Sequence, residues 1–449
     1  MDAELVARYD RRVPRYTSYP TAPHFSPSIG HETYTTWLRA LPAAETLSLY
    51  LHIPFCAELC LYCGCHTTVA RRYAPVGAYM DLLEREIALV AQHLGERRTV
   101  THIHWGGGTP NIVSPLQLIE IMRVLRAHFN VRQGAEIAVE IDPRTLTLAH
   151  VGAFAVMGVN RASLGVQDFD ETVQRAIGRI QSYQTTAQAV RWLRSAGINS
   201  LNLDLMYGLP HQTVGTVIES VTQALRLEPD RIAMFGYAHV PWMKRHQTLL
   251  PVDALPDAAE RLRQMQAASA AIRRAGYVAV GLDHFTQPED SLAHSQRDGR
   301  LRRNFQGYTT DEASTLIGFG TSSISMLPQG YVQSESSTAA YRAAMASGRL
   351  PTARGIALAA GDRLRRAIIE RLMCDLEVDL GPLARSYGEE PGDFKSELAA
   401  LDVMAQDGLV ARRGYRISVP DEARPLLRSV CAVFDRYLST AAAKHSQPV

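Results

Sequence analysis

The sequence lacks the long apolar runs that mark a membrane protein. No stretch of about 18 consecutive apolar residues occurs in the 449-residue chain, so we expect no transmembrane helix. The first 20 residues are charged and contain no apolar segment, which argues against a secretory signal peptide at this position. These two absences predict a cytoplasmic protein.

A large excess of charge of one sign is also missing. The chain carries 47 Lys and Arg residues against 45 Asp and Glu residues, a formal net charge of +2. Because nucleic-acid binding usually depends on concentrated positive charge, this balance does not favour nucleic acid as a partner. Internal repeats and low-complexity segments are absent, whereas 46% of the residues are hydrophobic, which is ample for a large core.

Cysteine is scarce, and its distribution is uneven. Four of the six cysteines lie in the segment HIPFCAELCLYCGCH, at Cys56, Cys60, Cys63 and Cys65. Thiols stay reduced in the cytoplasm, so this cluster predicts metal binding or catalysis rather than disulfides. Zinc sites usually combine two C-x2-C pairs, and no second pair follows this one.

Three thiolates on one loop are typical of a 4Fe–4S cluster that leaves one iron without a protein ligand. A loop held by zinc, or chance clustering, is the alternative interpretation. Cys65 follows Cys63 too closely to fill the fourth position easily, so we expect its thiol to lie behind the cluster or to face a substrate. Cys374 and Cys431 fall on apolar faces of predicted helices, which indicates buried core thiols.

Short apolar segments alternate with amphipathic helical segments from about residue 47 onward. The expected strands cover residues 47–55, 101–108, 135–142, 161–167, 200–208, 231–240 and 277–285. A helix start with a capping box is expected at Ser114, Pro115 and Gln117. Repeated βα units predict an α/β fold with a parallel sheet, and about six units predict a partial barrel. The cysteine cluster follows the first strand, and α/β barrels place their chemistry at such carboxyl ends.

Three regions are expected along the chain. Residues 1–44 contain five prolines and predict an extended N-terminal arm. Residues 45–345 form the barrel domain, and residues 350–449 form a mostly helical C-terminal domain with a small hairpin at 411–419.

Several motifs resemble one known group of proteins. The spacing C-x3-C-x2-C after the first strand resembles the radical S-adenosylmethionine (SAM) enzymes, and HWGGGTP (104–110) resembles their glycine-rich element. Further motifs resemble the oxygen-independent coproporphyrinogen III oxidase family within that group. They are PRYTSYPTA (14–22), the extra Cys65, EIDP (140–143), GVQDF (165–169), NLDLMYGLP (202–210), YAHVP (237–241), LDHF (282–285) and NFQGYTT (304–310). The likeness covers nearly the whole chain.

This resemblance implies a reaction. Cys56, Cys60 and Cys63 would hold a 4Fe–4S cluster, and SAM would bind its open iron. An electron from a donor such as flavodoxin or ferredoxin would release a 5′-deoxyadenosyl radical, which removes hydrogen from a propionate β-carbon. Two propionates of coproporphyrinogen III would become vinyl groups, giving protoporphyrinogen IX. The resemblance also implies a monomer. The alternative is a related haem chaperone, a group that typically lacks the fourth cysteine and the N-terminal motif.

The family pattern further implies two SAM molecules. Ligands carried over for the first molecule are Tyr50, Gly107, Glu140 and Ile324. Those carried over for the second are Tyr62, Gly108, Thr109, Gln167, Arg179, Asp204 and Ala238. Carboxylates suit ribose hydroxyls, and an arginine suits the methionyl carboxylate. In the alternative interpretation, Glu140 and Asp204 are satisfied inside the barrel and Arg179 is a surface cation.

A substrate with four carboxylates predicts a cationic pocket. The candidates by charge are Arg15, Arg300, Arg302 and Arg303, although the last three could equally form a solvated basic face. Phe305 and Gln306 lie in a family motif and are expected to shape the same cavity. We assign no role to His239 and His284, which are expected to be core residues.

Overall fold

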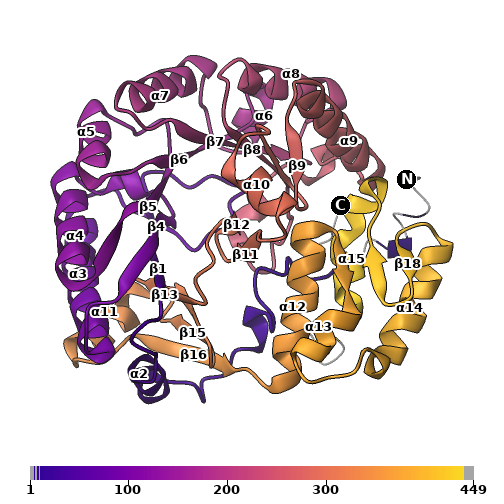
Figure 1. Ribbon diagram of the computed structural model, residues 1–449. Coiled ribbons are helices and arrows are strands. Elements are labelled where there is room, and N and C mark those ends of the chain that lie inside the picture. The colour runs from indigo at the N-terminus through magenta and orange to yellow at the C-terminus, as the bar shows by residue number, and fades with distance from the viewer. Residues whose placement is uncertain (1–4, 6–7, 10, 439–449) are drawn as a thin grey trace.

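The protein is built around one large sheet (Figure 1). This computed structural model describes residues 5, 8–9 and 11–438. The sheet has 12 strands in the order β16-β15-β14-β13-β1-β4-β5-β6-β7-β8-β10-β9. Its two edge strands, β16 and β9, are not paired with each other, so the curved sheet does not close.

Six consecutive parallel strands form the centre of the sheet. They are β1 (Leu47–Ile53), β4 (Thr99–Gly107), β5 (Asn130–Ile141), β6 (Arg161–Gln167), β7 (Ser200–Tyr207) and β8 (Arg231–Gly236). Every neighbouring pair is parallel, and β13 (Thr315–Phe319) joins β1 in parallel. The predicted partial (β/α)6-type barrel is therefore confirmed.

Helices cover the outer face of these strands (Figure 1). They are α3 (Ala74–Leu94), α4 (Pro115–His128), α5 (Leu148–Met157), α7 (Tyr183–Ser195), α8 (Val214–Leu225) and α9 (Ala258–Arg274). The short helix α6 (Glu171–Ala176) lies inside this ring, and its Val173 packs with Leu209 and Tyr237. The expected cap of α4 is present, since the Ser114 hydroxyl accepts from the backbone N–H of Gln117. The reciprocal half of the capping box is not formed, because the Gln117 side chain instead accepts a hydrogen bond from Tyr73.

The two ends of the sheet differ from the sequence prediction. Residues 277–285 were expected to form one strand, but they form the antiparallel hairpin β9 (Val278–Val280) and β10 (His284–Thr286). Strand β10 also runs antiparallel to β8. The chain turns at Gly281, where φ is +55° and a Cβ would collide with the ring of Tyr308. A glycine is needed there because no side chain fits.

The opposite end of the sheet carries three antiparallel strands. They are β14 (Ile324–Leu327), β15 (Gly330–Ser334) and β16 (Thr352–Ala357). The large sheet thus continues past residue 350, where the sequence suggests that a C-terminal domain begins. The division into arm, barrel and C-terminal domain remains a prediction.

The region after β16 is mostly helical, as expected. It contains α12 (Ala360–Asp375), α13 (Leu380–Ser386), α14 (Lys395–Gln406) and α15 (Leu427–Cys431). The expected hairpin is β18 (Ala411–Arg413) and β19 (Arg416–Ser418), to which β17 (Glu377–Asp379) adds a third strand. Cys374 and Cys431 are fully buried, which confirms the prediction of core thiols.

Smaller elements complete the fold. Short helices and strands are α2 (His31–Arg39), α10 (Ser291–Arg297), α11 (Thr338–Ala346), β2 (Phe55–Cys56), β3 (Thr68–Val69), β11 (Arg302–Asn304) and β12 (Gly307–Thr309). The 3-10 helices are η1 (Ala22–His24), η2 (Pro110–Ile112), η3 (Arg245–Leu249), η4 (Val252–Ala254), η5 (Pro391–Phe394), η6 (Asp421–Leu426) and η7 (Ala432–Phe434).

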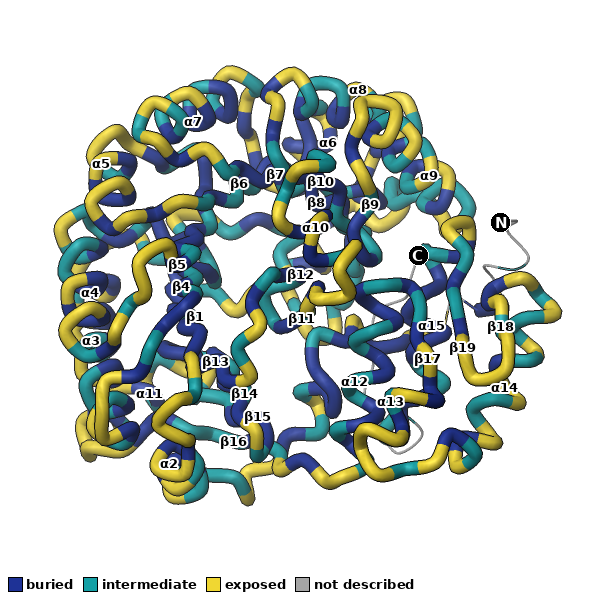
Figure 2. The backbone as a smooth tube through the Cα atoms, in the orientation of Figure 1, coloured by how far each residue is buried: buried dark blue, intermediate teal, exposed yellow. Residues whose placement is uncertain are grey.

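Burial separates the strands from the outer helical surface (Figure 2). One apolar core lies between the sheet and its helices, and a second lies within the C-terminal helices. Tyr9, Tyr16 and Tyr19 of the N-terminal segment pack into this second core. The segment is therefore bound to the C-terminal helices. Within the described residues, no helix is long and apolar enough to cross a membrane.

A buried carboxyl group joins α3 to α11 and to the segment that follows β13. Glu86 on α3 accepts hydrogen bonds from the Tyr341 hydroxyl at 2.6 Å and from the Gly320 N–H at 2.7 Å. Burial raises the pKa of Glu86 from 4.5 to about 7. The protonated form is therefore favoured in the folded state. The stability that it contributes is complete below pH 4.5 and is lost as the pH rises through 7.

Replacing this group should change how stability depends on pH. The original protein should lose stability between pH 5 and pH 8, and Glu86→Gln should not. The difference in free energy of unfolding between the variant and the original protein should therefore change by about 2 to 3 kcal/mol in favour of the variant. Urea unfolding at the two pH values measures the difference, with Asp81→Asn on the exposed side of α3 as control. An equal effect of Glu86→Gln at both pH values would contradict the assignment.

Candidate functional site

A cavity of about 630 Å³ lies where the parallel strands end, at the carboxyl edge of the barrel. Most of the residues predicted from the sequence line it. They are Cys56, Cys60, Tyr62, Cys63, Cys65, Gly107, Gly108, Thr109, Glu140, Gln167, Arg179, Asp204 and Ala238. This volume is typical of cofactor and small-molecule sites.

Each of the three predicted ligand thiols accepts at least one hydrogen bond. Cys56 Sγ accepts from the hydroxyls of Thr67 at 3.1 Å and Thr109 at 3.3 Å. Cys63 Sγ accepts from the backbone N–H of Cys65 at 3.3 Å, and the Cys65 thiol lowers the pKa of Cys63 to about 6. Donors of this kind stabilise thiolates, the form that binds iron.

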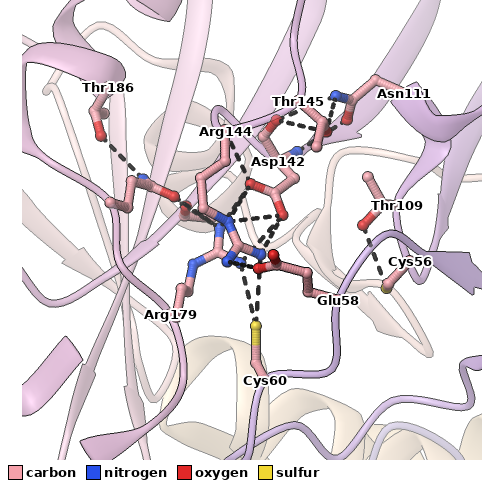
Figure 3. Close-up of polar contacts among 12 residues, drawn as sticks. Cys56, Glu58, Cys60, Thr109, Asn111, Asp142, Arg144, Thr145, Arg179 and Thr186 are labelled. Carbon is pink, nitrogen blue, oxygen red and sulfur yellow. Dashed lines mark hydrogen bonds and ion pairs between the residues drawn. The ribbon is translucent and has the colours of Figure 1, made fainter. Parts of the chain in front are cut away.

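Cys60 lies against the guanidinium groups of two arginines (Figure 3). Arg179 Nη1 is 3.6 Å and Arg144 Nη2 is 3.7 Å from the sulfur. Cys60 is the most buried of the three thiols, at 8% exposure. Two cationic side chains therefore contact one buried sulfur.

These thiols fit a 4Fe–4S cluster by their chemistry and common loop. In the described part of the chain, no group of three His, Cys, Asp or Glu residues is arranged around a single ion. Three cysteines that do not surround one point still fit a 4Fe–4S cluster, because each would bind a different iron atom.

The cysteine loop is held from a distant part of the chain. After β8, His246 Nε2 lies 2.7 Å from the Cys63 carbonyl, and Lys244 Nζ donates to the Cys65 carbonyl at 2.8 Å. Gln247 donates to the carbonyls of Tyr62 and Ala238. Sequence analysis missed these three residues, because their contacts lie about 180 positions away and no local motif marks them.

The glycine run at the end of β4 is required by close packing. A Cβ on Gly106 would lie 2.6 Å from Glu140, and one on Gly107 would lie 2.9 Å from His52. Gly107 also has φ of +115°, which favours glycine. A Cβ on Gly108 would lie 2.6 Å from the Phe55 carbonyl and 3.0 Å from Cys56 Sγ. The glycine turn and the cysteine loop are therefore in direct contact.

Two carboxylates face the cavity from β5 and β7. Glu140 accepts from the Gly107 N–H at 3.2 Å and lies 3.0 Å from His104 Nε2. Asp204 accepts from Ser163 at 3.0 Å and Asn202 at 2.7 Å. Burial, followed by the charge of Glu140, raises the pKa of Asp204 to about 6. Both groups are partly satisfied inside the barrel, yet both line the cavity.

Gln167 occupies an unusual backbone position at the end of β6. Its φ is +70°, and the pairing of β6 with β7 shifts register between Gly165 and Gln167. A non-glycine residue in this region carries strain, which often occurs at functional sites. Because of this register shift, Gln167 does not follow the alternation of side chains between the two faces of β6.

Arg179 is a buried residue and not the surface cation of the alternative interpretation. It contacts both carboxylate oxygens of Asp142, at 3.3 and 3.4 Å, and donates to the Gly165 carbonyl at 2.7 Å. Asp142 and Arg144 also line the cavity but were not predicted. Their signal was available in the motif EIDP and the arginine that follows it.

Two predicted ligands lie outside the cavity lining. The Tyr50 hydroxyl is 3.0 Å from His52 Nδ1, and the ring stacks on His104. Ile324 packs against a small apolar cluster that contains Phe25 and Tyr331. Their predicted contact with SAM is not tested.

The arginine candidates separate into three environments. Arg15 lines the cavity. Arg300 pairs with Asp298 and Glu312, and Arg302 pairs with Glu370, so both belong to surface ion pairs away from the lining. Arg303 lies over the Tyr308 ring, 4.5 Å from its centre. Among these four, only Arg15 is placed to meet a ligand in this cavity.

The other candidates play packing roles. Phe305 and Gln306 are not among the described lining residues, and Phe305 packs edge-on against Tyr331. His239 Nδ1 lies 2.9 Å from the Tyr237 hydroxyl, and His284 Nδ1 lies 2.7 Å from Asp283.

Comparison with known proteins identifies the class first. A model described as the radical SAM superfamily matches residues 50–224, the segment from β1 to α8 that contains the cysteine loop. The segment that carries the first parallel strands and the cysteine loop is therefore similar to radical SAM enzymes.

Similarity to individual proteins narrows the class. The chain is 52% identical to the oxygen-independent coproporphyrinogen III oxidase of Bradyrhizobium diazoefficiens, over 100% of both chains. It is 44% identical to the enzyme of that name from Paracoccus denitrificans, over 99% of this chain and 98% of that one. The solved coproporphyrinogen III oxidase of Escherichia coli, described as a radical SAM enzyme, matches with a TM-score of 0.90. That alignment has 37% identity and covers 95% and 100% of the two chains.

The chain belongs to the oxygen-independent coproporphyrinogen III oxidase family of radical SAM enzymes. The family predicted from the sequence motifs is thus confirmed. The names of these relatives favour the oxidase over the haem-chaperone alternative.

Substitution of a loop glycine tests the contact between the two motifs. Gly108→Ala should reduce affinity for the cluster on the order of tenfold, because the added methyl group displaces the loop that carries Cys56. Iron content after anaerobic reconstitution measures the loss. Gly64→Ala lies in the same loop and meets nothing within 4 Å, so it is the matched control. Equal iron contents in the two variants would contradict the proposed contact.

Proposed function

We propose that this protein catalyses the oxygen-independent decarboxylation of two propionates of coproporphyrinogen III to vinyl groups, giving protoporphyrinogen IX. The main support is one cavity that contains the three cysteine thiols, the glycine turn and Arg15 of the N-terminal motif. The named relatives support the same activity.

Cys56, Cys60 and Cys63 hold a 4Fe–4S cluster, and SAM binds beside it. Together these cofactors supply a carbon radical able to remove hydrogen from an unactivated C–H bond, which no side-chain base can do. The protein binds the cofactors, orients them and limits the access of water to them. Donors from Thr67, Thr109 and Cys65 hold the thiolates in place.

Two SAM molecules are part of this proposal. The first would meet Gly107 and Glu140 with Tyr50 and Ile324, although the last two lie outside the lining of the cavity. The second would meet Tyr62, Gly108, Thr109, Gln167, Arg179, Asp204 and Ala238. Glu140 and Asp204 would accept from ribose hydroxyls, and Arg179 would bind a methionyl carboxylate.

Arg15 is proposed to bind a propionate carboxylate of the substrate. Within the described residues, its guanidinium makes no hydrogen bond or ion pair, whereas Arg144 and Arg179 are bound to Asp142. The Arg303 side chain donates to the Arg15 carbonyl at 3.5 Å. The arm thus brings one available cation to the cavity.

Removal of this cation should weaken substrate binding. A hydrogen bond to a charged group contributes about 1.5–3 kcal/mol, so Arg15→Gln should raise KM for coproporphyrinogen III by roughly tenfold or more. Arg302→Gln, which breaks only the pair with Glu370, is the control. Steady-state kinetics under anaerobic conditions measure both. The assignment of Arg15 is wrong if the two variants have the same KM.

The reaction itself is tested with reconstituted protein, dithionite, SAM and coproporphyrinogen III. Chromatography should detect both 5′-deoxyadenosine and protoporphyrinogen IX, and Cys56→Ser should abolish both products because one cluster ligand is lost. Cys374→Ala, in α12, is the control. Deoxyadenosine without porphyrin product would instead favour a haem chaperone or another substrate. If protein with an intact cluster forms neither of the two products, the radical mechanism is excluded.

The proposal extends to the surroundings of the enzyme. A one-electron donor such as flavodoxin or ferredoxin would reduce the cluster, and the enzyme would act as a cytoplasmic monomer. Nucleic acid and membranes are not expected as partners. The arm at 1–44, the barrel at 45–345 and the C-terminal domain at 350–449 would form its functional regions.

A further inference from the structure

Two arginine side chains reach the Cys60 thiol, and Asp142 contacts both of them (Figure 3). Arg144 Nη2 and Arg179 Nη1 donate toward the sulfur at 3.7 and 3.6 Å. Asp142 lies between the two guanidiniums, 2.7 Å from Arg144 and 3.3 Å from Arg179. The three groups form one network that includes the proposed cluster ligand.

The charges of this network do not cancel. Two guanidiniums share one carboxylate, so one positive charge is in excess beside Cys60. Glu58 also approaches Arg144, at 3.4 Å, but its side chain is 74% exposed, and water screens it. Although burial opposes ionisation, the hydrogen bond from Arg144 and the nearby arginine charges keep the pKa of Asp142 low. Asp142 is therefore charged, and the excess is one unit.

The position of Asp142 is fixed by its backbone. Its N–H donates to Asn111 Oδ1 at 3.0 Å, and Asn111 Nδ2 donates to its carbonyl at 3.1 Å. Asn111 lies in η2, directly after the glycine turn. Asp142 can therefore orient both arginines without moving itself.

The two arginines differ in their remaining partners. Arg179 also donates to the Gly165 carbonyl and to Gln181, which hold it in the barrel wall. Among the residues that the structure describes, the Arg144 side chain contacts only the sulfur apart from Asp142 and exposed Glu58. The burial, charge and direction of Arg144 thus have no evident structural use beyond this network.

We propose that Arg144, oriented by Asp142, raises the reduction potential of the cluster bound through Cys60. This inference rests on the cluster assignment of the proposed function. Reduction adds one electron, taken from an external one-electron donor, and breaks no bond at the site. The added negative charge is stabilised by a nearby cation and by N–H donors to the ligand sulfur, two factors that set the potentials of iron–sulfur clusters.

The test is a redox titration of the full-length protein, reconstituted anaerobically and followed by electron paramagnetic resonance without SAM. Arg144→Gln should shift the reduction equilibrium at least tenfold toward the oxidised form, a fall of about 59 mV for one electron. Arg144→Lys keeps the charge but loses the planar fork, so its potential should fall less. Glu58→Gln removes the exposed partner alone and is the matched control, with little change expected.

The outcomes separate this inference from the function on which it rests. Unchanged potential in Arg144→Gln, at full iron content, would overturn the role of Arg144 alone. A lower unfolding temperature with unchanged potential would show a purely structural role. If Arg144→Gln fails to retain iron, the titration of Arg144→Met decides, because this variant also removes the charge, and an unchanged potential there overturns the inference. A parent protein that binds no 4Fe–4S cluster would overturn both proposals.

Discussion

The contact between the cysteine loop and the glycine turn is the constraint on which the site depends. Gly108 leaves no room for a side chain, because the Phe55 carbonyl and Cys56 Sγ occupy that space. The next residue, Thr109, donates to the same sulfur. The ends of β1 and β4, which are neighbours in the sheet, therefore fix the first ligand relative to the backbone that would receive a cofactor. A methyl group at this point would separate the two motifs.

Charge is arranged around the cavity in two groups. On the cluster side, Arg144 and Arg179 exceed Asp142 by one charge and lie against Cys60. Glu140 lies on β5, two residues before Asp142, and Asp204 lies on β7, where burial favours the protonated form of Asp204. A negatively charged cluster and a cationic cofactor require opposite surroundings. Side chains at and just after the ends of the strands supply both within one cavity.

The C-terminal helices hold the N-terminal arm in place beside the cavity. Tyr9, Tyr16 and Tyr19 are packed into the core of those helices, and the Tyr16 hydroxyl donates to Asp435 at 3.1 Å. This packing holds residues 13–15 against the cavity, opposite the strand ends. An arm of this composition could not hold an arginine in place alone, because ordering a chain segment costs conformational entropy. The helices offset that cost by burying its tyrosines.

The sequence by itself determined the family and the parallel barrel, and it predicted the three cysteine ligands, because these depend on local spacing and on the period of apolar residues. Most proposed SAM contacts also line the cavity, since strand ends in a parallel sheet meet at one edge. Only the tertiary structure decided which of the candidate arginines lies at the cavity. Arg15, Arg300, Arg302 and Arg303 look alike in sequence, yet one faces the cavity and two form surface pairs. It also decided that Arg144 meets Cys60 and that residues 277–285 turn back at Gly281. Such contacts join residues far apart in the chain, and local patterns carry no information about which distant side chain will fill a given space.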